Sequence, residues 1–444
     1  MGKEQAEEVM RVIIIGGGFA GLRAGVALSE RGAEVLLLER RSFLGGRAYS
    51  FRDPVTNDTV DNGQHLFMGC YRQTIRFLEK IGTLDRLKFQ DNARVDFLDR
   101  ENGFTSFDCP PLPAPLHALV GLLRMRGLTP GDKLRALKVG RAIQRNGQPV
   151  TVSAWLDRLD QSQRIKERFW YPMTIATLNE SPEIASAEMM KVVLKEAFGS
   201  SRKSASIGIA RVGLSDLYTT DASAFITARN GVVRTGAQVN RFVIEQGKVA
   251  AVELKDGEKI TADYFISAVT PSALLQMIPD ELRAGELGAL AGLSSSPIVS
   301  INLWFDRQII DREFVGLIGT RSQWVFNKDL IVKPAGQANQ IAVIISAARD
   351  FVDWTKDQMV EMAMAELNEL LPKSRSAKLL HCRIVKEREA TLSHTLDSDR
   401  IRPVARTQVP NLILAGDWTA TGLPATIESA VISGEVAAKI VMED

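Results

Sequence analysis

The apolar residues near the N-terminus follow two different patterns in succession. Residues 12–15 are a continuous aliphatic run, which is typical of a strand buried on both faces of a parallel sheet. Residues 20–30 follow with a helical pattern, and residues 34–38 form a second apolar run. The order of strand, tight turn, helix and strand predicts the first unit of an α/β fold.

Two later segments carry related patterns. Residues 231–269 alternate between apolar and polar positions and turn at Gly247 and at Asp256-Gly257, which predicts antiparallel hairpins. Residues 412–415 form a strand, and a helix begins after Pro424, a residue type favoured in the first turn of a helix. Because the strand, glycine turn and helix of the N-terminus return near the C-terminus, we expect the chain to fold back on itself.

Residues 112–145 have a pattern of their own. Four prolines among residues 110–115 interrupt regular structure, and the turn sequence at 127–131 predicts a helical hairpin. Apolar residues recur at helical spacing, at Leu116, Leu119, Val120 and Leu123. The segment has Asp132 as its only acid against seven bases, which are Arg124, Arg126, Lys133, Arg135, Lys138, Arg141 and Arg145. This charge suits an anionic membrane surface, and a solvated basic face over a packed helix is the alternative.

Composition limits the function classes. The chain has 444 residues, of which 45% are hydrophobic and 24% charged, as in ordinary globular proteins. A net charge of only +2 gives no global field for nucleic acid. The three cysteines are too few and too scattered for a disulfide framework or a cysteine-rich metal site, which favours a reducing cytoplasm and no bound metal. The acidic N-terminus predicts no signal peptide, and Ala6 does not fit a myristoylation signal.

The turn after the first strand carries the first sign of chemistry. Gly16, Gly18 and Gly21 have the G-x-G-x-x-G spacing, with Phe19 and Ala20 between the last two glycines. Gly16 permits the turn, Gly18 lets the backbone approach a pyrophosphate, and Gly21 lets the helix close on the sheet. The phosphate would then lie at the positive end of the helix. The spacing therefore predicts dinucleotide binding.

The end of the second strand refines this prediction. Glu39 lies eighteen residues past Gly21, where its carboxylate would accept hydrogen bonds from the adenosine ribose and repel a 2′-phosphate. This disfavours NADP. Arg40 follows directly and is included among the candidate cofactor residues.

Residues 44–50, LGGRAYS, separate FAD from NAD. They are similar to the GGRxxS element that follows the second strand in the flavoprotein superfamily of amine oxidases and phytoene desaturases. The resemblance implies that Gly45 and Gly46 allow close backbone approach. It also implies that Arg47 places a guanidinium near the dinucleotide phosphates.

The same resemblance implies cofactor contacts further along the chain. Val239 would meet the adenine with its backbone, and Gly416 and Asp417 would lie at the ribityl and pyrophosphate region. The amides at the start of the last helix would point at the flavin, and these belong to Ala425, Thr426 and Ile427. No cysteine follows Cys382, so a thioether link to the flavin has no local donor and we expect noncovalent FAD.

The sequence DNGQH falls where the superfamily brings backbone beside the isoalloxazine ring, and it supplies Asp61, Gly63, Gln64 and His65. Together with residues 169–187 and 416–431 it resembles the hydroxysqualene dehydroxylase family, also called squalene-associated FAD-dependent desaturases, over nearly the whole chain. The resemblance implies reductive removal of the hydroxyl of hydroxysqualene to give squalene for hopanoid-type triterpenes. Protonation of the departing oxygen and hydride transfer from reduced flavin would accomplish it.

His65 is the leading candidate for the proton donor, because it alone of the four histidines falls in this motif. It could instead hydrogen-bond the flavin or brace the loop. Asp61 is a second catalytic candidate with a structural alternative, and Tyr71, Tyr171 and Tyr218 stay open. Residues 169–171, Phe-Trp-Tyr, could line an isoprenoid tunnel or belong to the core.

Three rival functions stay open. A carotenoid-type desaturase shares every flavin motif and runs the hydride transfer in the opposite direction. An amine oxidase fits less well, since only Trp418 is placed to build an aromatic cage. A nonenzymatic isoprenoid-binding escort protein would not need the intact phosphate elements and Glu39.

The expected partners follow from a C30 isoprenoid substrate. Each CH₂ moved into water costs about 0.8 kcal/mol, so such an enzyme should collect its substrate from lipid. We therefore expect a cytoplasmic protein that associates peripherally with the inner face of the cell membrane through residues 112–145. Enzymes of the squalene pathway are candidate partners, and nucleic acid is not.

The expected architecture is an α/β flavoprotein with a Rossmann-like, discontinuous FAD-binding domain and an interleaved α+β substrate domain. The FAD-binding domain takes residues 1–90, 205–270 and 400–444. The substrate domain takes residues 91–204 and 271–399, including the helical segment at 112–145.

Overall fold

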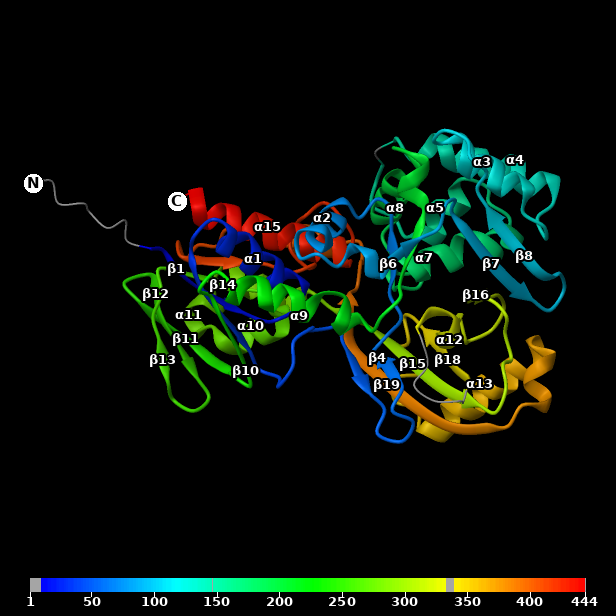
Figure 1. Ribbon diagram of the computed structural model, residues 1–444. Coiled ribbons are helices and arrows are strands. Elements are labelled where there is room, and N and C mark those ends of the chain that lie inside the picture. Colours follow the sequence, from blue (N-terminus) through cyan, green and yellow to red (C-terminus); the bar gives the residue numbers. More distant parts are fainter. Residues whose placement is uncertain (1–8, 146, 333–338, 444) are drawn as a thin grey trace, which may run out of the picture.

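The computed structural model describes residues 9–145, 147–332 and 339–443 (Figure 1). The molecule has two lobes, each built around its own sheet. Both ends of the described chain lie on the first lobe.

The sheet of the first lobe is parallel throughout and draws its strands from distant parts of the chain. In spatial order the strands are β10 (Val232–Thr235), β2 (Glu34–Glu39), β1 (Arg11–Ile15), β14 (Tyr264–Ser267) and β20 (Leu412–Leu414). Their apolar sequences suit this position because both faces of the sheet are covered.

Three helices pack together over one face of this sheet, namely α1 (Phe19–Glu30), α9 (Leu214–Thr227) and α15 (Ile427–Glu443). The contact between α1 and α15 is close, since a Cβ on Gly434 would lie 2.3 Å from the carbonyl oxygen of Ala20. The other face is covered by α10 (Pro271–Met277) and by a small sheet of β11 (Val239–Glu245), β12 (Lys248–Leu254) and β13 (Lys259–Ile260).

The second lobe contains a seven-stranded mixed sheet. Its strands, in order, are β19 (Leu379–Leu392), β15 (Ser295–Phe305), β18 (Asn339–Ile345), β17 (Trp324–Asn327), β16 (Phe314–Leu317), β7 (Arg94–Asp99) and β8 (Gly103–Asp108). Helix α13 (Lys356–Leu370) packs into the apolar core of this sheet. A helical layer meets its β7–β8 end and includes α3 (Leu116–Arg124), α4 (Pro130–Ala142), α5 (Val152–Arg158), α7 (Tyr171–Leu178) and α8 (Ala187–Phe198).

Short strands connect the two lobes. Strand β9 (Ile207–Ala210) pairs with β5 (Leu66–Met68) and β6 (Leu87–Phe89), and β3 (Ser50–Arg52) pairs with β4 (Thr59–Asp61). Helix α2 (Arg72–Lys80) is capped from the first lobe, because the buried carboxylate of Glu428 accepts hydrogen bonds from the amides of Gln73 and Thr74. The segments around the DNGQH sequence therefore lie at the junction of the lobes (Figure 1).

The predicted α/β fold is confirmed. All five strands of the first sheet fall in the ranges expected for the FAD-binding domain, and all seven strands of the second sheet fall in those expected for the substrate domain. Helix α10 departs from this division. It follows the boundary at residue 270, yet its Leu274 and Met277 are buried in the core of the first lobe.

The expected helical hairpin is present as α3 and α4. Thr129 begins α4 with a capping box, since its hydroxyl accepts from the Asp132 amide while the Asp132 carboxylate accepts from the Thr129 amide. Within the described residues, none of the helices has both the length and the hydropathy needed to cross a bilayer.

Candidate cofactor and active site

The glycine turn lies between β1 and α1, and its geometry requires glycine. Gly16 has φ +112°, and a Cβ on Gly21 would lie 1.9 Å from the carbonyl oxygen of Gly16. Helix α1 begins directly after Gly18, with no side-chain cap and no acid in its first turn among the described residues. The helix therefore presents free amides and its positive end at the turn, which suits a phosphate.

Glu39 ends β2 beside this turn. Its carboxylate accepts hydrogen bonds from the amides of Gly17 at 2.8 Å and Arg41 at 2.9 Å. Arg40 is exposed, while the guanidinium of Arg41 donates to the carbonyl oxygen of Gly46 at 2.9 Å. Arg41, which was not among the predicted site residues, is thus the arginine that braces the glycine loops. Alternation along the strand end places Arg40 outward.

The second glycine loop packs against the first. The Gly45 amide donates to the carbonyl oxygen of Gly17 at 2.9 Å, and a Cβ on Gly46 would lie 3.1 Å from the Cα of Gly18. The two glycine loops thus pass each other with bare backbone.

Tyr218, one of the open candidates for the proton donor, supports this second loop. Its hydroxyl lies 2.8 Å from the carbonyl oxygen of Gly45 and 2.9 Å from that of Ala48. Its ring is fully buried and stacks on Phe19 with centroids 3.7 Å apart. Burial raises the pKa of its hydroxyl far above the ordinary value, so Tyr218 braces the loop and does not serve as an acid.

Arg47 and Asp417 form an ion pair between residues 370 positions apart in the chain. Asp417 is buried, and Gly416 before it has φ +146° and donates its amide to the hydroxyl of Ser433 at 2.7 Å. The predicted GGR loop and the predicted closing motif are therefore in direct contact.

Trp418 lies in the core of the first lobe. Its indole N–H donates to the carbonyl oxygen of Val269 at 2.9 Å, and the side chain is 1% exposed. The expectation that Trp418 is placed to form part of an aromatic cage is therefore wrong, because the ring completes the packing under the sheet.

The start of the last helix has an unexpected partner. The amide of Ala425 donates to Nε2 of the buried His394 at 2.7 Å, which makes that nitrogen an acceptor and places the ring proton on Nδ1. The amides of Thr426 and Ile427 follow at the N-terminus of α15. Val239 begins β11, and Ala237 before it donates its amide to the carbonyl oxygen of Glu39 at 2.9 Å.

Asp61 lies in a buried ion pair with Lys328, which begins α12 (Lys328–Ile331) in the second lobe. Lys328 Nζ lies 2.7 Å from Asp61 Oδ2 and 3.0 Å from Gln64 Oε1. The other oxygen of Asp61 accepts from the Ser50 hydroxyl at 2.7 Å and the Leu214 amide at 3.1 Å. Asp61 is therefore saturated by fixed donors, which suits a structural anion better than a proton carrier.

His65 lies on the same loop and has no hydrogen-bond partner among the described residues. Burial lowers the pKa of its imidazole; nearby Asp61 raises that pKa to a smaller extent and Arg47 lowers it further. A Cβ on Gly63 would lie 4.0 Å from His65 Nε2, so the loop leaves space beside the ring.

The remaining tyrosines differ in surroundings. Tyr71 hydrogen-bonds Thr426, and burial raises the pKa of its hydroxyl. The Tyr171 hydroxyl lies 3.0 Å from Ser153 Oγ, and Tyr171 lines a cavity of about 450 Å³ in the second lobe with Phe97, Ile175 and Trp324.

Phe169 and Trp170 lie in the core of the helical layer, and Trp170 Nε1 donates to the side-chain oxygen of Gln161 at 3.1 Å. Of the three aromatic residues, only Tyr171 therefore stays a candidate for lining an isoprenoid tunnel. In the same motif Asn179 holds a left-handed turn, and buried Glu180 forms a bidentate ion pair with Arg349. These contacts give the motif a structural role.

Besides Arg41, the site residues that the sequence did not indicate are Lys328 and His394. Neither belongs to a local motif, because each reaches the site only through the tertiary fold. Within the described residues, no cluster of three or more His, Cys, Asp or Glu side chains is suited to hold a metal ion.

Comparison with known proteins agrees with this geometry. The chain is 29% identical over 435 residues to hydroxysqualene dehydroxylase of Rhodopseudomonas palustris, covering 97% of this chain and 98% of that one. It is 24% identical over 464 residues to 15-cis-phytoene desaturase of Synechococcus elongatus, covering 98% and 96%.

Among solved structures, an oxidoreductase from Methanosarcina mazei has a TM-score of 0.74 at 18% identity, covering 98% of this chain and all of that one. Putrescine oxidase, in a redesigned triple mutant, has a TM-score of 0.73 at 14% identity, covering 98% of this chain and 99% of that one. The family model described as flavin containing amine oxidoreductase matches residues 19–442. The protein is thus an FAD-dependent oxidoreductase, and the chain belongs to the flavin-containing amine oxidoreductase family.

Proposed function

We propose that this enzyme removes the hydroxyl of hydroxysqualene reductively to give squalene. The observation that carries the proposal is the similarity to a hydroxysqualene dehydroxylase, which extends over 97% of the chain without loss of either lobe. The DNGQH loop supports it, because Lys328 and Asp61 fix that loop where the cofactor lobe meets the second lobe.

The residues that would hold FAD fit such a group. The free amides of α1 after Gly16, Gly18 and Gly21, at Phe19 and Ala20, would bind the pyrophosphate, and the carboxylate of Glu39 would bind the adenosine ribose. The bare backbone of Gly45 and Gly46 leaves room beside this turn. The remaining proposed contacts are Arg47, Gly63, Gln64, His65, Val239, Gly416, Asp417, Thr426 and Ile427.

Two predicted contacts need adjustment. The Ala425 amide is engaged by His394, so we assign Ala425 a supporting position at the start of α15. Arg40 points to the surface, so we assign the bracing role to Arg41.

The reaction breaks a C–O bond, releases the hydroxyl as water after it gains one proton, and forms a C–H bond. When bound and reduced, FAD would supply the hydride, and with it both electrons. We assign the proton to His65, because its half-buried ring lies on the DNGQH loop and is free of other hydrogen bonds among the described residues. Asp61 and Lys328 hold the loop that presents it.

The substrate would reach this loop along β17. Trp324 lies at one end of β17 and lines the apolar part of the 450 Å³ cavity, and Lys328 follows the other end. Phe97, Ile175 and Tyr171 line the same cavity and would pack against an isoprenoid chain. The lining also includes the charged residues Asp99, Arg100, Glu101, Glu167 and Arg168.

The test is an anaerobic incubation of the photoreduced protein with hydroxysqualene or with phytoene, followed by product analysis. Squalene from hydroxysqualene is the expected result. If hydroxysqualene stays unchanged and the oxidised protein desaturates phytoene, the enzyme is instead a carotenoid-type desaturase. The similarity to 15-cis-phytoene desaturases makes this the second candidate.

The proposed setting is the inner face of the cell membrane, where the hydrocarbon substrate is dissolved. Enzymes that make or use C30 isoprenoids are the proposed partners. Co-purification of the protein with membranes, and its release by high salt, would test this setting.

A further inference from the structure

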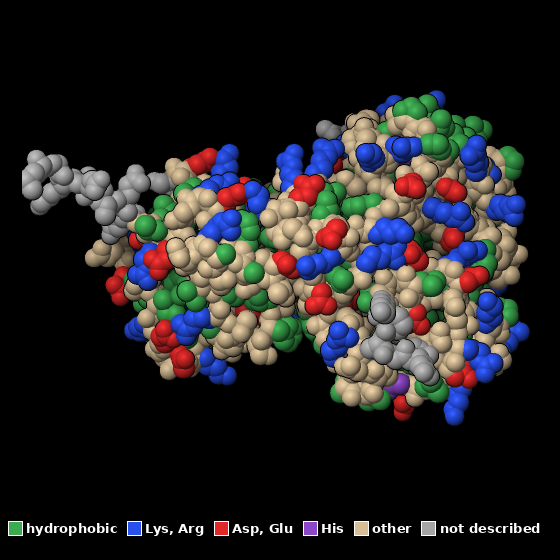
Figure 2. Space-filling model, in the orientation of Figure 1, with side chains coloured by type: hydrophobic (Ala, Val, Ile, Leu, Met, Phe, Trp, Pro, Cys, Tyr) green, Lys and Arg blue, Asp and Glu red, His purple; other side chains and the backbone are tan. Residues whose placement is uncertain are grey.

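The outer surface of the α3–α4 hairpin is unusually rich in exposed leucine. Of the six leucines that are exposed in the described residues, four lie between positions 112 and 134, and these are Leu112, Leu116, Leu123 and Leu134. Figure 2 shows hydrophobic side chains gathered over this end of the molecule, with Lys and Arg side chains among them. Single exposed leucines are ordinary, but a concentration on one hairpin indicates a surface that contacts apolar material.

The bases of the hairpin fall into two groups. Arg135 and Lys138 share Asp160 as a carboxylate partner, at 3.4 and 3.1 Å. The others have no ion pair among the described residues, and these are Arg124, Arg126, Lys133, Arg141 and Arg145. The acid of the hairpin, Asp132, is used in the cap of α4. The surface that carries the leucines thus has uncompensated positive charge.

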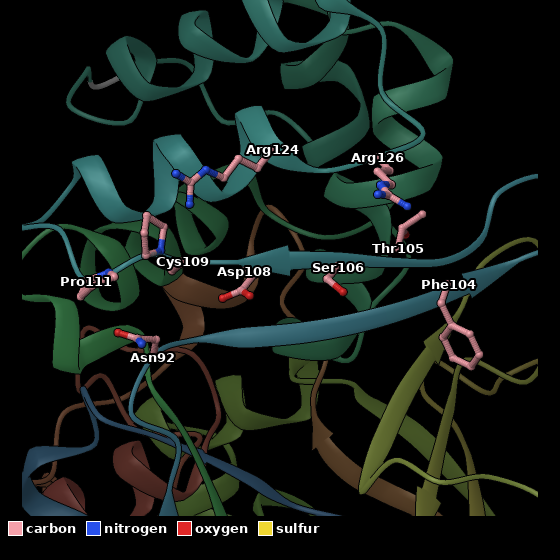
Figure 3. Close-up of a pocket in the computed structure, with 10 residues that line it drawn as sticks. Asn92, Phe104, Thr105, Ser106, Asp108, Cys109, Pro111, Arg124 and Arg126 are labelled. Carbon is pink, nitrogen blue, oxygen red and sulfur yellow. The ribbon is translucent and has the colours of Figure 1, made fainter.

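A pocket of about 470 Å³ opens between β8 and the end of α3. Arg124 and Arg126 lie on its helix side, apart from each other along β8, and Ser106 and Asp108 of β8 complete the lining (Figure 3). Met125 between the two arginines is 1% exposed, so its buried side chain anchors the segment. Among the described residues that line the pocket, Asp108 is the only carboxylate, and it lies 3.7 Å from the guanidinium of Arg94.

The pocket also contains an unused acceptor. Asn92 Oδ1 is buried and has no hydrogen-bond partner among the described residues. Asn92 lines the pocket with the hydroxyl-bearing Thr105 and Ser106. An arginine suits a phosphodiester, and an amide oxygen beside a carboxylate suits the hydroxyl groups of the same molecule.

We propose that the α3–α4 hairpin docks on an anionic bilayer and that this pocket binds a phospholipid headgroup of the phosphatidylglycerol type. The exposed leucines enter the acyl boundary, the unpaired bases face anionic lipid, and Arg124 takes the headgroup phosphate while Arg126 adds positive charge at the other end of the pocket. Asn92 and Asp108 accept from the headgroup hydroxyls. The docking surface deepens the proposed membrane setting and rests on it, whereas the headgroup pocket goes beyond the proposed reaction and is tested without the substrate.

The first test is co-sedimentation of the full-length holoenzyme with two kinds of vesicle, phosphatidylcholine alone and phosphatidylcholine mixed with phosphatidylglycerol. The double variant R124Q/R126Q should lose about tenfold or more in binding to the mixed vesicles. The matched control R135Q/K138Q removes the same charge from bases that already have a carboxylate partner, and it should lose much less. If the two variants lose equal amounts of binding to the mixed vesicles, the pocket does not bind the headgroup.

The leucines are tested in the same assay. The double variant L116N/L123N should weaken binding to both kinds of vesicle, whereas L380N, which changes an exposed leucine on β19, should not. If the wild-type protein sediments with neither kind of vesicle, the hairpin does not dock on a bilayer, and its exposed leucines would instead indicate a protein partner. Unchanged FAD absorbance and melting temperature establish that each variant is folded.

The second test separates the lipid headgroup from free phosphate. Short-chain phosphatidylglycerol, kept below its micelle concentration, should bind the wild-type protein in a calorimetric titration and should bind R124Q/R126Q about tenfold or more weakly. N92L should lower the preference for phosphatidylglycerol over phosphatidic acid. If inorganic phosphate binds as tightly as the lipid, the site is a phosphate site and the headgroup assignment fails.

Discussion

Lys328 of the second lobe and Asp61 of the DNGQH loop form a buried ion pair, with Nζ 2.7 Å from Oδ2 and both side chains at most 5% exposed. The pair joins elements 267 residues apart in the chain. Because Lys328 also binds Gln64, one cation fixes two residues of the loop that carries His65.

Removing the Lys328 cation should strongly destabilise the fold. We expect Lys328→Met to lower the free energy of unfolding by about 3–5 kcal/mol, since Asp61 would remain buried without its partner. Lys80→Met, which breaks an exposed pair with Glu30, should cost about 1 kcal/mol or less. Urea denaturation of the three proteins measures both values.

A double variant distinguishes the ion pair from simple packing. Asp61→Asn combined with Lys328→Met leaves no unpaired charge and should recover part of the lost stability. If the double variant is as unstable as the sum of the single variants, the two side chains do not interact as described.

The ion pair of Arg47 and Asp417 should control cofactor retention. We expect Arg47→Ala to weaken FAD binding by about tenfold to a hundredfold, because it removes charged hydrogen bonds that hold the second glycine loop against the closing motif. Arg40→Ala, at the exposed position beside Glu39, should retain FAD as the wild type does. Flavin absorbance after dialysis gives the comparison.

Gly21 and Gly140 give opposite expectations for the same substitution. Gly21→Ala would place a methyl group 1.9 Å from the carbonyl oxygen of Gly16, so α1 must move and FAD retention should be lost. Gly140→Ala meets nothing within 4 Å in helix α4 and should stabilise the protein by about 0.5–1 kcal/mol. A Gly21→Ala protein with full FAD content would contradict the role given to the turn.

The rate of the reductive step should depend on pH through His65. Burial lowers the pKa of His65 below the ordinary imidazole value of about 6.5, so its protonated form predominates only at a pH under that lowered pKa. The single-turnover rate should therefore be highest at low pH and fall by about tenfold per pH unit above the lowered pKa. His65→Gln should remove this fall along with most of the rate, and a rate that rises with pH in the wild type would exclude His65 as the acid.

Local sequence was enough to predict much of the cofactor lobe. Gly16, Gly18 and Gly21 act on their immediate neighbours, so their spacing alone indicates a turn that can approach a phosphate. The same holds for the hairpin at 112–145, because its amphipathic spacing and the turn sequence at 127–131 are local. The α/β class followed from these elements.

The site contacts that the sequence did not predict are contacts between distant segments of the chain. No spacing rule connects Lys328 to Asp61, or His394 to the Ala425 amide, since those partners meet only after both lobes have formed. Trp418 was misjudged for the same reason, because the partner that draws its indole inward is the carbonyl oxygen of Val269, on the loop after β14. Aromatic density at 169–170 likewise could not distinguish a tunnel wall from a core.

The interleaving of the first sheet has a consequence for biosynthesis. Strand β1 and the GGR loop leave the ribosome early, whereas β20 and Asp417 follow on the order of tens of seconds later at ordinary elongation rates. Throughout that interval the nascent chain lacks one wall of its nucleotide groove. Flavin loading is therefore a late event in the life of each molecule, and prematurely terminated chains should remain apoprotein and be cleared by proteolysis.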